Sequence, residues 1–306
     1  MSTTPYANSL FEQPWWLDAV APGQWEEALV TDANGSVMAR MPYVKTGNRI
    51  TMPPLTQNLG IWMAPEIRDD YTARKNVINE LFSRFERCQS VRQTLSPLND
   101  YVLPFRWLGY RMEPRFTYRL TDLSDCDRLY AAFAKNCKRH IKSAQKKLTL
   151  NHKLDMDVLW RMLNKTFEAQ NRKNPMSREV VFRIVAACEK ERHGQYLEAR
   201  DAEGNVHSCA YFVYDEQVCY YLLGASDPAF RSSGAQSLIL WEGIQFASAH
   251  SKIFDFEGSM IEGIETFFRQ FGGVCTPYYE VRKLTLLEEI MEVWKPHIKR
   301  ALGYKL

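Results

Sequence analysis

Apolar residues recur every three or four positions in several segments of the chain, which is the spacing of one face of an α-helix. This pattern predicts helices over residues 73–87, 125–148, 155–170, 177–192, 235–250, 261–270 and 286–302. Segment 235–250 is apolar on most faces, so we expect it to be buried. The segment 286–302 is amphipathic, which predicts a helix with one face against the protein.

Shorter segments with β-forming residues, separated by turn sequences, predict strands. They cover residues 26–31, 37–43, 60–63, 92–95, 116–120, 195–200, 207–214, 218–224, 252–257 and 277–284. The second half therefore contains a three-stranded meander, a buried helix, a strand, a helix and a strand, and the first half contains a weaker version of this order. We expect an α/β (α+β) fold of two similar units, each with a mixed, largely antiparallel sheet flanked by helices.

Composition limits the class of protein. The 306 residues are 45% hydrophobic, which is enough for about two domains. The net charge is only +3, so any basic surface must be local. Seven cysteines without a CxxC pair predict reduced thiols, no metal site and a cytoplasmic location. We find no signal peptide pattern at the start and no apolar stretch near the ~20 residues that span a membrane.

The first candidate for chemistry is the loop between segments 218–224 and 235–250. It is rich in glycine and serine and leads directly into a helix, whose first N–H groups and dipole favour an anion such as a pyrophosphate. The candidate donor-binding residues are Arg231, Ser232, Ser233, Gly234 and Ala235. The alternative, an ordinary connection with a serine cap, remains open.

Two carboxylates form the second candidate. Asp255 and Glu257 alternate with apolar residues, which predicts that both project from one face of a strand. A carboxylate at a strand end can orient an amine or accept its proton. The alternative is a half-exposed strand with two solvated acids.

Three further groups of residues are candidates for contacting a substrate. Arg269 precedes a glycine pair that is typical of a helix end, and Tyr279 and Lys283 follow on the next strand. Tyr221 lies on the strand before the candidate donor loop. Lys138 and Arg139 belong to a basic stripe within 125–148, which is either a solvated helix face or a dock for RNA or an anionic substrate.

These segments, in this order, resemble the FemAB-type branch of the GNAT superfamily, including its BioF2-like acetyltransferase domains. The family's basic helix, Arg-x-x-Ile-x-x-Ala-x-Lys, is matched by residues 138–146, and its Asp-x-x-Gly strand end by residues 255–258. The helix end and aromatic strand that follow are matched by residues 267–273 and 278–283, and residues 53–60 resemble the family's N-terminal half. The resemblance spans most of the chain and is strongest from about residue 125.

The resemblance implies tandem GNAT-like domains, here residues 1–145 and 146–284, with the C-terminal helix 285–306 packing back onto the first. It implies transfer of an acyl or aminoacyl group to an amine, with an acyl-CoA-like thioester as donor. Asp255, Glu257 and Arg269 are then the expected catalytic residues. Two alternatives are a FemX-like enzyme that uses aminoacyl-tRNA on a cell-wall precursor, and a non-catalytic protein that binds a small ligand or a partner.

The sequence departs from the family at one informative position. Where members that use aminoacyl-tRNA carry lysine, this chain has Phe268, and Arg269 follows it. A cation at this place would stabilise the oxyanion of a tetrahedral intermediate. Because Phe268 has no charge, the tRNA-dependent reaction is less expected, and the non-catalytic alternative has its best support at this position.

Overall fold

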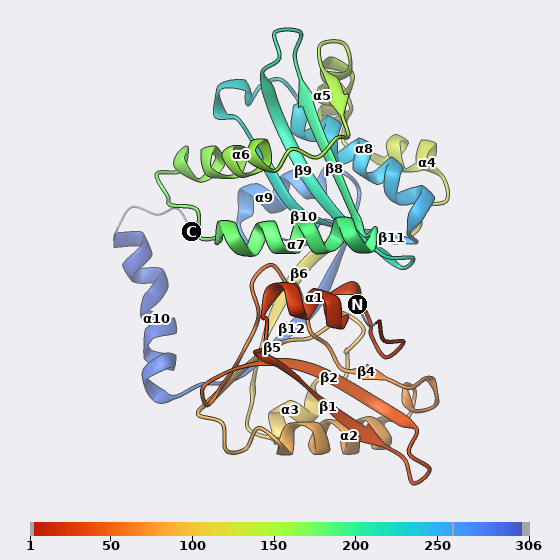
Figure 1. Cartoon of the computed structure of the whole chain (residues 1–306), viewed down its shortest axis with the longest axis vertical. Coiled ribbons are helices and arrows are strands. Elements are labelled where there is room, and N and C mark those ends of the chain that lie inside the picture. Colours follow the sequence, from red (N-terminus) through yellow and green to blue (C-terminus); the bar gives the residue numbers. More distant parts are fainter. Residues whose placement is uncertain (1–2, 259, 302–306) are drawn as a thin grey trace. The chain divides into compact units, whose positions relative to one another are not determined.

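The structure, a computed structural model, describes residues 3–258 and 260–301, with residues 295–301 described by their backbone only. The chain divides into two compact units, residues 1–115 with 277–306 and residues 116–276. Figure 1 shows the order of the elements along the chain. The limits expected from the sequence, 145 and 284, differ from these. The difference arises because Cys137, Ile141 and Ala144 join the core of the second unit.

The sheet of the first unit has the strand order β1-β2-β3-β5-β12, and β4 pairs with Ala39 and Arg40 of β2. All of these pairings are antiparallel except that between β3 and β5. The strands are β1 (Trp25–Thr31), β2 (Val37–Thr46), β3 (Arg49–Thr51), β4 (Trp62–Met63), β5 (Ser90–Thr94) and β12 (Val274–Lys283).

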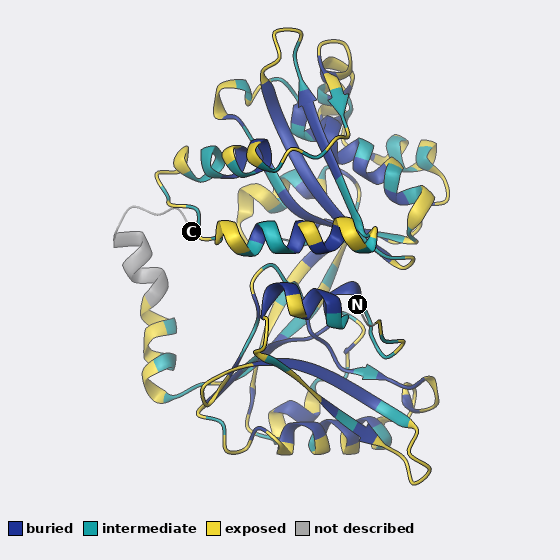
Figure 2. Cartoon of the chain, viewed as in Figure 1, coloured by how far each residue is buried: buried dark blue, intermediate teal, exposed yellow. Residues whose placement is uncertain are grey.

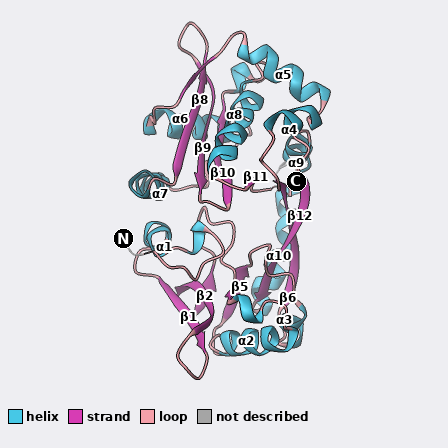
Figure 3. Ribbon diagram, turned by 90° about the vertical axis from the view of Figure 1, so that its right-hand side faces the viewer, coloured by secondary structure: helices cyan, strands magenta, loops and turns pink. Residues whose placement is uncertain are grey.

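Helices flank this sheet on both sides. The helices α2 (Tyr71–Ser83) and α3 (Leu103–Trp107) cover one face and α1 (Pro14–Val20) lies over the other (Figures 1 and 3). Asp70 is the N-cap of α2, and its carboxylate accepts the N–H groups of Thr72 and Ala73. The apolar face of α2 then packs into the core that the strands line.

The helix α10 (Leu286–Ala301) binds the first unit through its acidic face. Thr285 and Glu288 form a reciprocal cap at its start, because each side chain accepts the other's backbone N–H. Three glutamates then form ion pairs with arginines of the unit: Glu288 with Arg49, Glu289 with Arg111, and Glu292 with Arg92. These three ion pairs hold the helix against strands of the first unit.

The second unit has the strand order β6-β11-β10-β9-β8-β7. Only β10 and β11 run parallel, and the other pairs are antiparallel. The prediction of a mixed, largely antiparallel sheet flanked by helices is thus confirmed. The strands are β6 (Arg111–Leu120), β7 (Thr149–Asn151), β8 (Gly194–Arg200), β9 (Val206–Tyr214), β10 (Val218–Ser226) and β11 (Ile253–Asp255).

Figure 3 shows α6 (Met156–Glu168) and α7 (Arg178–Glu191) on one face of this sheet, and α4 (Cys126–Ala132), α5 (Lys135–Gln145) and α8 (Ala235–His250) on the other. The helix α9 (Glu262–Arg269) follows β11. The helix α8 has the predicted bounds and is largely buried, as predicted (Figure 2). It forms the centre of the unit's core, together with α5.

The predicted helix 125–148 is wrong as a single element, because the chain breaks it into α4 and α5. Phe133 adopts an extended conformation and is buried against Trp241 and Phe271. The N–H of Ala134 is donated to the carbonyl of Gln270, outside the helix. Burying an aromatic ring and satisfying this amide outweigh the continuous helical pattern.

All seven cysteines are free thiols. Among residues 3–258 and 260–301, no helix is long and apolar enough to cross a membrane. Within the same described part of the chain, no group of three His, Cys, Asp or Glu side chains is arranged to hold a metal ion.

Candidate functional site

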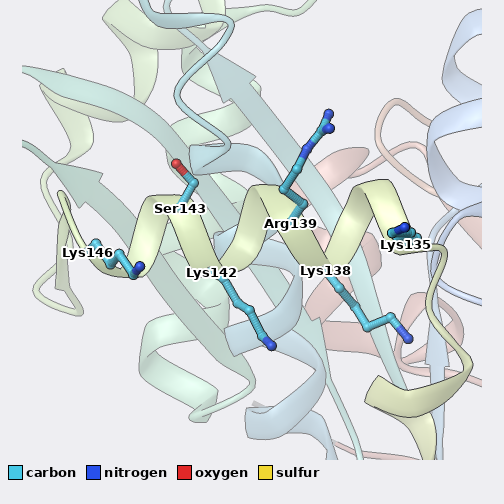
Figure 4. Close-up of a pocket in the computed structure, with 6 residues that line it drawn as sticks. All are labelled: Lys135, Lys138, Arg139, Lys142, Ser143 and Lys146. Carbon is cyan, nitrogen blue, oxygen red and sulfur yellow. The ribbon is translucent and has the colours of Figure 1, made fainter.

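The helix α5 separates a buried apolar face from an exposed basic one. Cys137, Ile141 and Ala144 are buried, and burial raises the pKa of the Cys137 thiol to about 12, so this cysteine is not a thiolate nucleophile. The opposite face is hollowed and is lined by Lys135, Lys138, Arg139, Lys142, Ser143 and Lys146. Figure 4 shows Arg139 and Ser143 leaning to one side of the helix and Lys138 and Lys142 to the other. We call this surface the basic α5 face.

The start of α8 lies directly against α5. Gly234 precedes the helix with φ +79°, in the left-handed region where glycine is favoured. A Cβ atom at this position would lie 2.5 Å from the carbonyl oxygen of His140. His140 lies between Arg139 and Ile141 on α5, so the candidate donor loop is adjacent to the basic α5 face.

The first turn of α8 presents backbone amides without acceptors. Ser233 Oγ accepts the N–H of Ala235 at 3.2 Å, so one amide is capped from within the loop. The N–H groups of Gln236 and Ser237 have no acceptor among the described residues. Unpaired amides at the positive end of a helix dipole favour the binding of an anion. Arg231 and Ser232 precede it and are exposed.

Hydrogen bonds and ring stacking fix the start of the loop. Thr166 Oγ1 of α6 bonds both the N–H and the carbonyl of Ser226. The carboxylate of Asp227 accepts the N–H of Ala229 and pairs with Lys165 at 2.5 Å. The ring of Phe230 stacks on His207, with the ring centroids 3.9 Å apart. The loop is therefore preorganised before any ligand binds.

Tyr221 lies inside the unit, under the start of α8. Its hydroxyl accepts a hydrogen bond of 3.2 Å from Gln236 Nε2, and its ring packs edge-on against Phe268. Burial raises the pKa of Tyr221 to about 12, so the hydroxyl stays protonated at neutral pH. The structure places Tyr221 behind the first turn of α8, with 7% of its surface exposed.

Asp255 ends β11 as a fully buried residue, with 0% exposure. Its Oδ1 accepts the hydroxyl of Thr117 at 2.5 Å and the N–H of Glu257 at 2.7 Å. Its Oδ2 pairs with Arg119 Nε at 2.6 Å. A buried carboxylate needs this kind of compensation, and the bonds leave Asp255 enclosed by β6 and the following turn.

Glu257 lies outside the strand. The predicted strand 252–257 is wrong at its end, since β11 stops at Asp255 and Glu257 has φ +58°. The two carboxylates therefore do not share one face of a strand. Glu257 is half-buried, and its Oε1 is buried without a hydrogen-bond partner among the described residues. Burial, together with the nearby charge of Asp255, raises the pKa of the Glu257 carboxyl well above its ordinary value.

The remaining predicted residues lie elsewhere. Arg269 is exposed on α9, 3.5 Å from Glu265. Phe268 beside it is buried in the aromatic core, where a lysine would lose its hydration. Tyr279 and Lys283 are on the part of β12 that belongs to the first unit. Tyr279 is half-buried, and Lys283 is exposed, 5.9 Å from the centre of the Tyr110 ring.

The structure thus groups most predicted residues of the second unit into two places, with Arg269 apart on α9. The loop 231–235 lies beside the basic α5 face, and Glu257 lies beside Asp255. Sequence reasoning missed Thr117 and Arg119, which hold Asp255, and Gln236, which bonds Tyr221. No local motif marks these three residues, because each acts on a partner that is distant in sequence.

Gly234→Ala is expected to lower the free energy of unfolding by roughly 1–3 kcal/mol, because it adds left-handed strain and a clash with α5. Gly204→Ala is the matched control: Gly204 has φ +85° in the same unit, but nothing lies within 4 Å of an added Cβ. Urea unfolding should show the larger loss for Gly234→Ala. Equal losses would show that the loop does not need the close approach of α5.

A family model describes part of the second unit. Residues 131–259 match the acetyltransferase (GNAT) domain. This span includes α5, the loop 231–235 and both carboxylates. No protein with a curated description matches the chain.

Solved structures with the same fold cover nearly the whole chain. FemX has a TM-score of 0.66 at 13% identity, covering 93% of this chain and 94% of its own. L-PGS from Bacillus licheniformis has a TM-score of 0.56 at 11% identity, covering 88% of each chain. A tandem GNAT protein from the clavulanic acid biosynthesis pathway has a TM-score of 0.55 at 11% identity, covering 86% and 84%. At such low sequence identities, the similarity shows a shared fold and nothing more.

Proposed function

We propose that this chain, a GNAT-fold acyltransferase, moves an acyl or aminoacyl group from an acyl-CoA-like thioester to an amine. The observation that carries the proposal is the acetyltransferase domain match over residues 131–259. Within this one span lie an unpaired helix N-terminus, preceded by the exposed Arg231, and a buried carboxyl with a partnerless oxygen. These are the features that a phosphate-bearing donor and an amine acceptor require.

The donor would bind through its phosphates. The amides of Gln236 and Ser237 would bond the pyrophosphate oxygens, and the exposed Arg231 would add a charge-assisted bond. Ser232, Ser233, Gly234 and Ala235 shape the turn that brings these groups together. Because the loop is already bonded to α6, little ordering entropy is lost on binding.

The acceptor amine would be activated by Glu257. As the neutral nitrogen attacks the carbonyl carbon, its proton passes to the Glu257 carboxylate. The tetrahedral intermediate then collapses, the carbon–sulfur bond breaks, and the thiolate leaves and takes up a proton from solvent. A raised pKa makes Glu257 a stronger base, since basicity increases with pKa. The reaction requires the ionised form, so turnover should rise with pH through that raised pKa.

Two further predicted residues, Arg269 and Tyr221, remain part of the proposal. Arg269 would approach the acyl oxygen or the acceptor from α9, where its guanidinium is exposed. Tyr279 and Lys283 lie on the part of β12 that belongs to the first unit, and their contact with a substrate stays a prediction. Tyr221 would support the first turn of α8 through Gln236 and thereby contribute to donor binding.

Thermal unfolding in the presence of acetyl-CoA tests the proposed donor. A ligand at 100-fold its dissociation constant adds about 2.7 kcal/mol to the free energy of unfolding, so we expect a clear rise in Tm. The matched control is S-acetyl-N-acetylcysteamine, which keeps the thioester but lacks the pyrophosphate and should give no shift. Release of free thiol from acetyl-CoA with a panel of primary amines then tests transfer. A chain that gives neither a shift nor thiol release does not use this donor.

The basic α5 face favours a second candidate, transfer from aminoacyl-tRNA to an amine on a cell-wall precursor. Four lysines and one arginine line this hollow, and a row of cations along a helix matches a nucleic-acid backbone. The support for this candidate is the charge of the basic α5 face, and contacts to a phosphate backbone carry no sequence information.

Reversing the charge at Lys138 and Arg139 separates the two donors. If tRNA binds the basic α5 face, Lys138→Glu with Arg139→Glu should weaken tRNA binding strongly and reduce the slope of log K against log salt by about 2. The affinity for acetyl-CoA should change much less. Lys190→Glu on the exposed surface of α7 is the control. A tRNA affinity that does not respond to the double reversal excludes this face as the tRNA site.

A further inference from the structure

The turn that carries Glu257 is attached to β6 at three successive points. The N–H of Phe256 bonds the carbonyl of Tyr118 at 3.0 Å. Asp255 accepts bonds from Thr117 and Arg119 of the same strand. Gly258 lies so close to β6 that a Cβ atom would be 2.1 Å from the carbonyl oxygen of Phe116. The turn therefore cannot move without breaking its contacts with β6.

We infer that Thr117, Arg119 and Asp255 are positioning residues for Glu257, and that Asp255 does not itself touch the substrate. This inference rests on the proposed role of Glu257 as the base. Asp255 is fully buried, and both of its carboxylate oxygens are bonded. Asp255 also accepts the N–H of Glu257. This bond fixes the backbone of Glu257, whose Oε1 has no partner among the described residues.

The backbone at Glu257 explains why such support is needed. A left-handed conformation at a residue other than glycine costs about 1–3 kcal/mol and persists only where its surroundings impose it. Glu257 has φ +58° and Gly258 has φ +56°, so two left-handed residues follow one another. The bond from the Glu257 N–H to Asp255 fixes this geometry, and Thr117 and Arg119 fix the Asp255 carboxylate in turn.

Groups from three strands act on Glu257 directly or through Asp255. Asp255 comes from β11, Arg119 from β6, and Tyr220, which is buried, from β10. Asp255 disfavours the ionised form of Glu257, and Arg119 offsets part of the Asp255 charge. The positioning residues therefore influence both the location and the protonation of the carboxyl.

Thr117→Val tests the positioning role with little change in shape. It removes the hydroxyl bond to Asp255 and keeps both charges. With acetyl-CoA as donor, thiol release should show kcat lowered about 10- to 100-fold, while KM for acetyl-CoA stays close to that of the parent. The Tm should fall modestly, because Oδ1 of the buried Asp255 loses one of its donors. Thr117→Ser restores the hydroxyl and should restore kcat. Unchanged kcat in Thr117→Val would overturn the inference.

Asp255→Asn tests the electrostatic part of the same arrangement. Removing the charge that disfavours ionised Glu257 should lower the pKa of Glu257, so the acidic limb of the kcat profile should move to lower pH. A titration of ¹³Cδ-labelled glutamate by NMR, with the resonance assigned from Glu257→Gln, measures the same change without substrate. An acidic limb and a Glu257 resonance that stay unmoved would contradict the inference.

Glu198→Gln is the matched control for loss of a buried acid. Glu198 is fully buried in the same unit and pairs with Arg200, so this variant should lower the Tm but leave the acidic limb in place.

The proposed base and the proposed positioning residues are contradicted by different results. If Asp255 is itself the base, Asp255→Asn abolishes turnover and Glu257→Gln retains it. If Glu257→Gln abolishes turnover while Thr117→Val and Asp255→Asn leave kcat and the limb unchanged, only the positioning role is wrong.

Discussion

Glu257→Gln is expected to lower kcat by roughly 10²- to 10⁴-fold, the usual contribution of a general base. The amide has nearly the same shape as the carboxyl but cannot accept a proton at neutral pH. The affinity for acetyl-CoA, measured by calorimetry, should be retained, because the donor loop does not contact this side chain in our account. Glu262→Gln, an exposed glutamate at the start of α9, should keep kcat. A Glu257→Gln enzyme with normal turnover would remove Glu257 from the mechanism.

The same substitution should stabilise the protein at high pH. Burial and Asp255 raise the folded-state pKa of Glu257, so the folded state binds the proton more tightly than the unfolded chain does. This contribution to stability is complete below the ordinary pKa of glutamate and is lost as pH rises through the raised value. Glutamine does not titrate in this range, so the variant does not lose stability through this position as the pH rises. The Tm of Glu257→Gln should therefore exceed that of the parent at pH 8, and the difference should shrink toward pH 4.

Arg119→Met is expected to cause the largest loss of stability, about 3–5 kcal/mol in the free energy of unfolding. Arg119 is 8% exposed and Asp255 is 0% exposed, so the substitution leaves a buried carboxylate without its cation. Methionine keeps much of the volume of the stem, so the loss reports mainly on the charge. Urea unfolding measures it.

Arg128→Met provides the comparison for this large effect. Arg128 pairs with Asp122 in the same unit, but both side chains are more than half exposed, and exposed pairs contribute little. Its unfolding curve should nearly overlay that of the parent. Similar curves for Arg119→Met and the parent would mean that Asp255 is not held as described.

Local patterns were sufficient where one element is determined by its own residues. The helix α8 was predicted with its observed bounds, because an apolar run follows a glycine that suits the left-handed start of the helix. The helix 125–148 was predicted wrongly, because periodicity carries no information on the distant core that draws Phe133 out of the helix. Tertiary packing decided that boundary.

The candidate site was only partly predictable for the same reason. The loop 231–235 and the two acids follow from residue types in a short segment. Alternation indicated that Asp255 and Glu257 are equivalent, whereas the backbone turns after Asp255 and gives them different environments. The contact between Arg119 and Asp255 joins residues 136 positions apart, and no spacing rule reports such a pair. Fold-level contacts gave the two acids different environments, since both oxygens of Asp255 are hydrogen-bonded whereas Oε1 of Glu257 has no partner among the described residues.

A crystal structure of the protein soaked with acetyl-CoA tests the account most directly. We expect the pyrophosphate within hydrogen-bond distance of the Gln236 and Ser237 amides, close to Arg231, with the thioester directed toward Glu257. Acetyl-CoA bound with its phosphates away from the first turn of α8, or no bound donor at saturating concentration, would contradict the account.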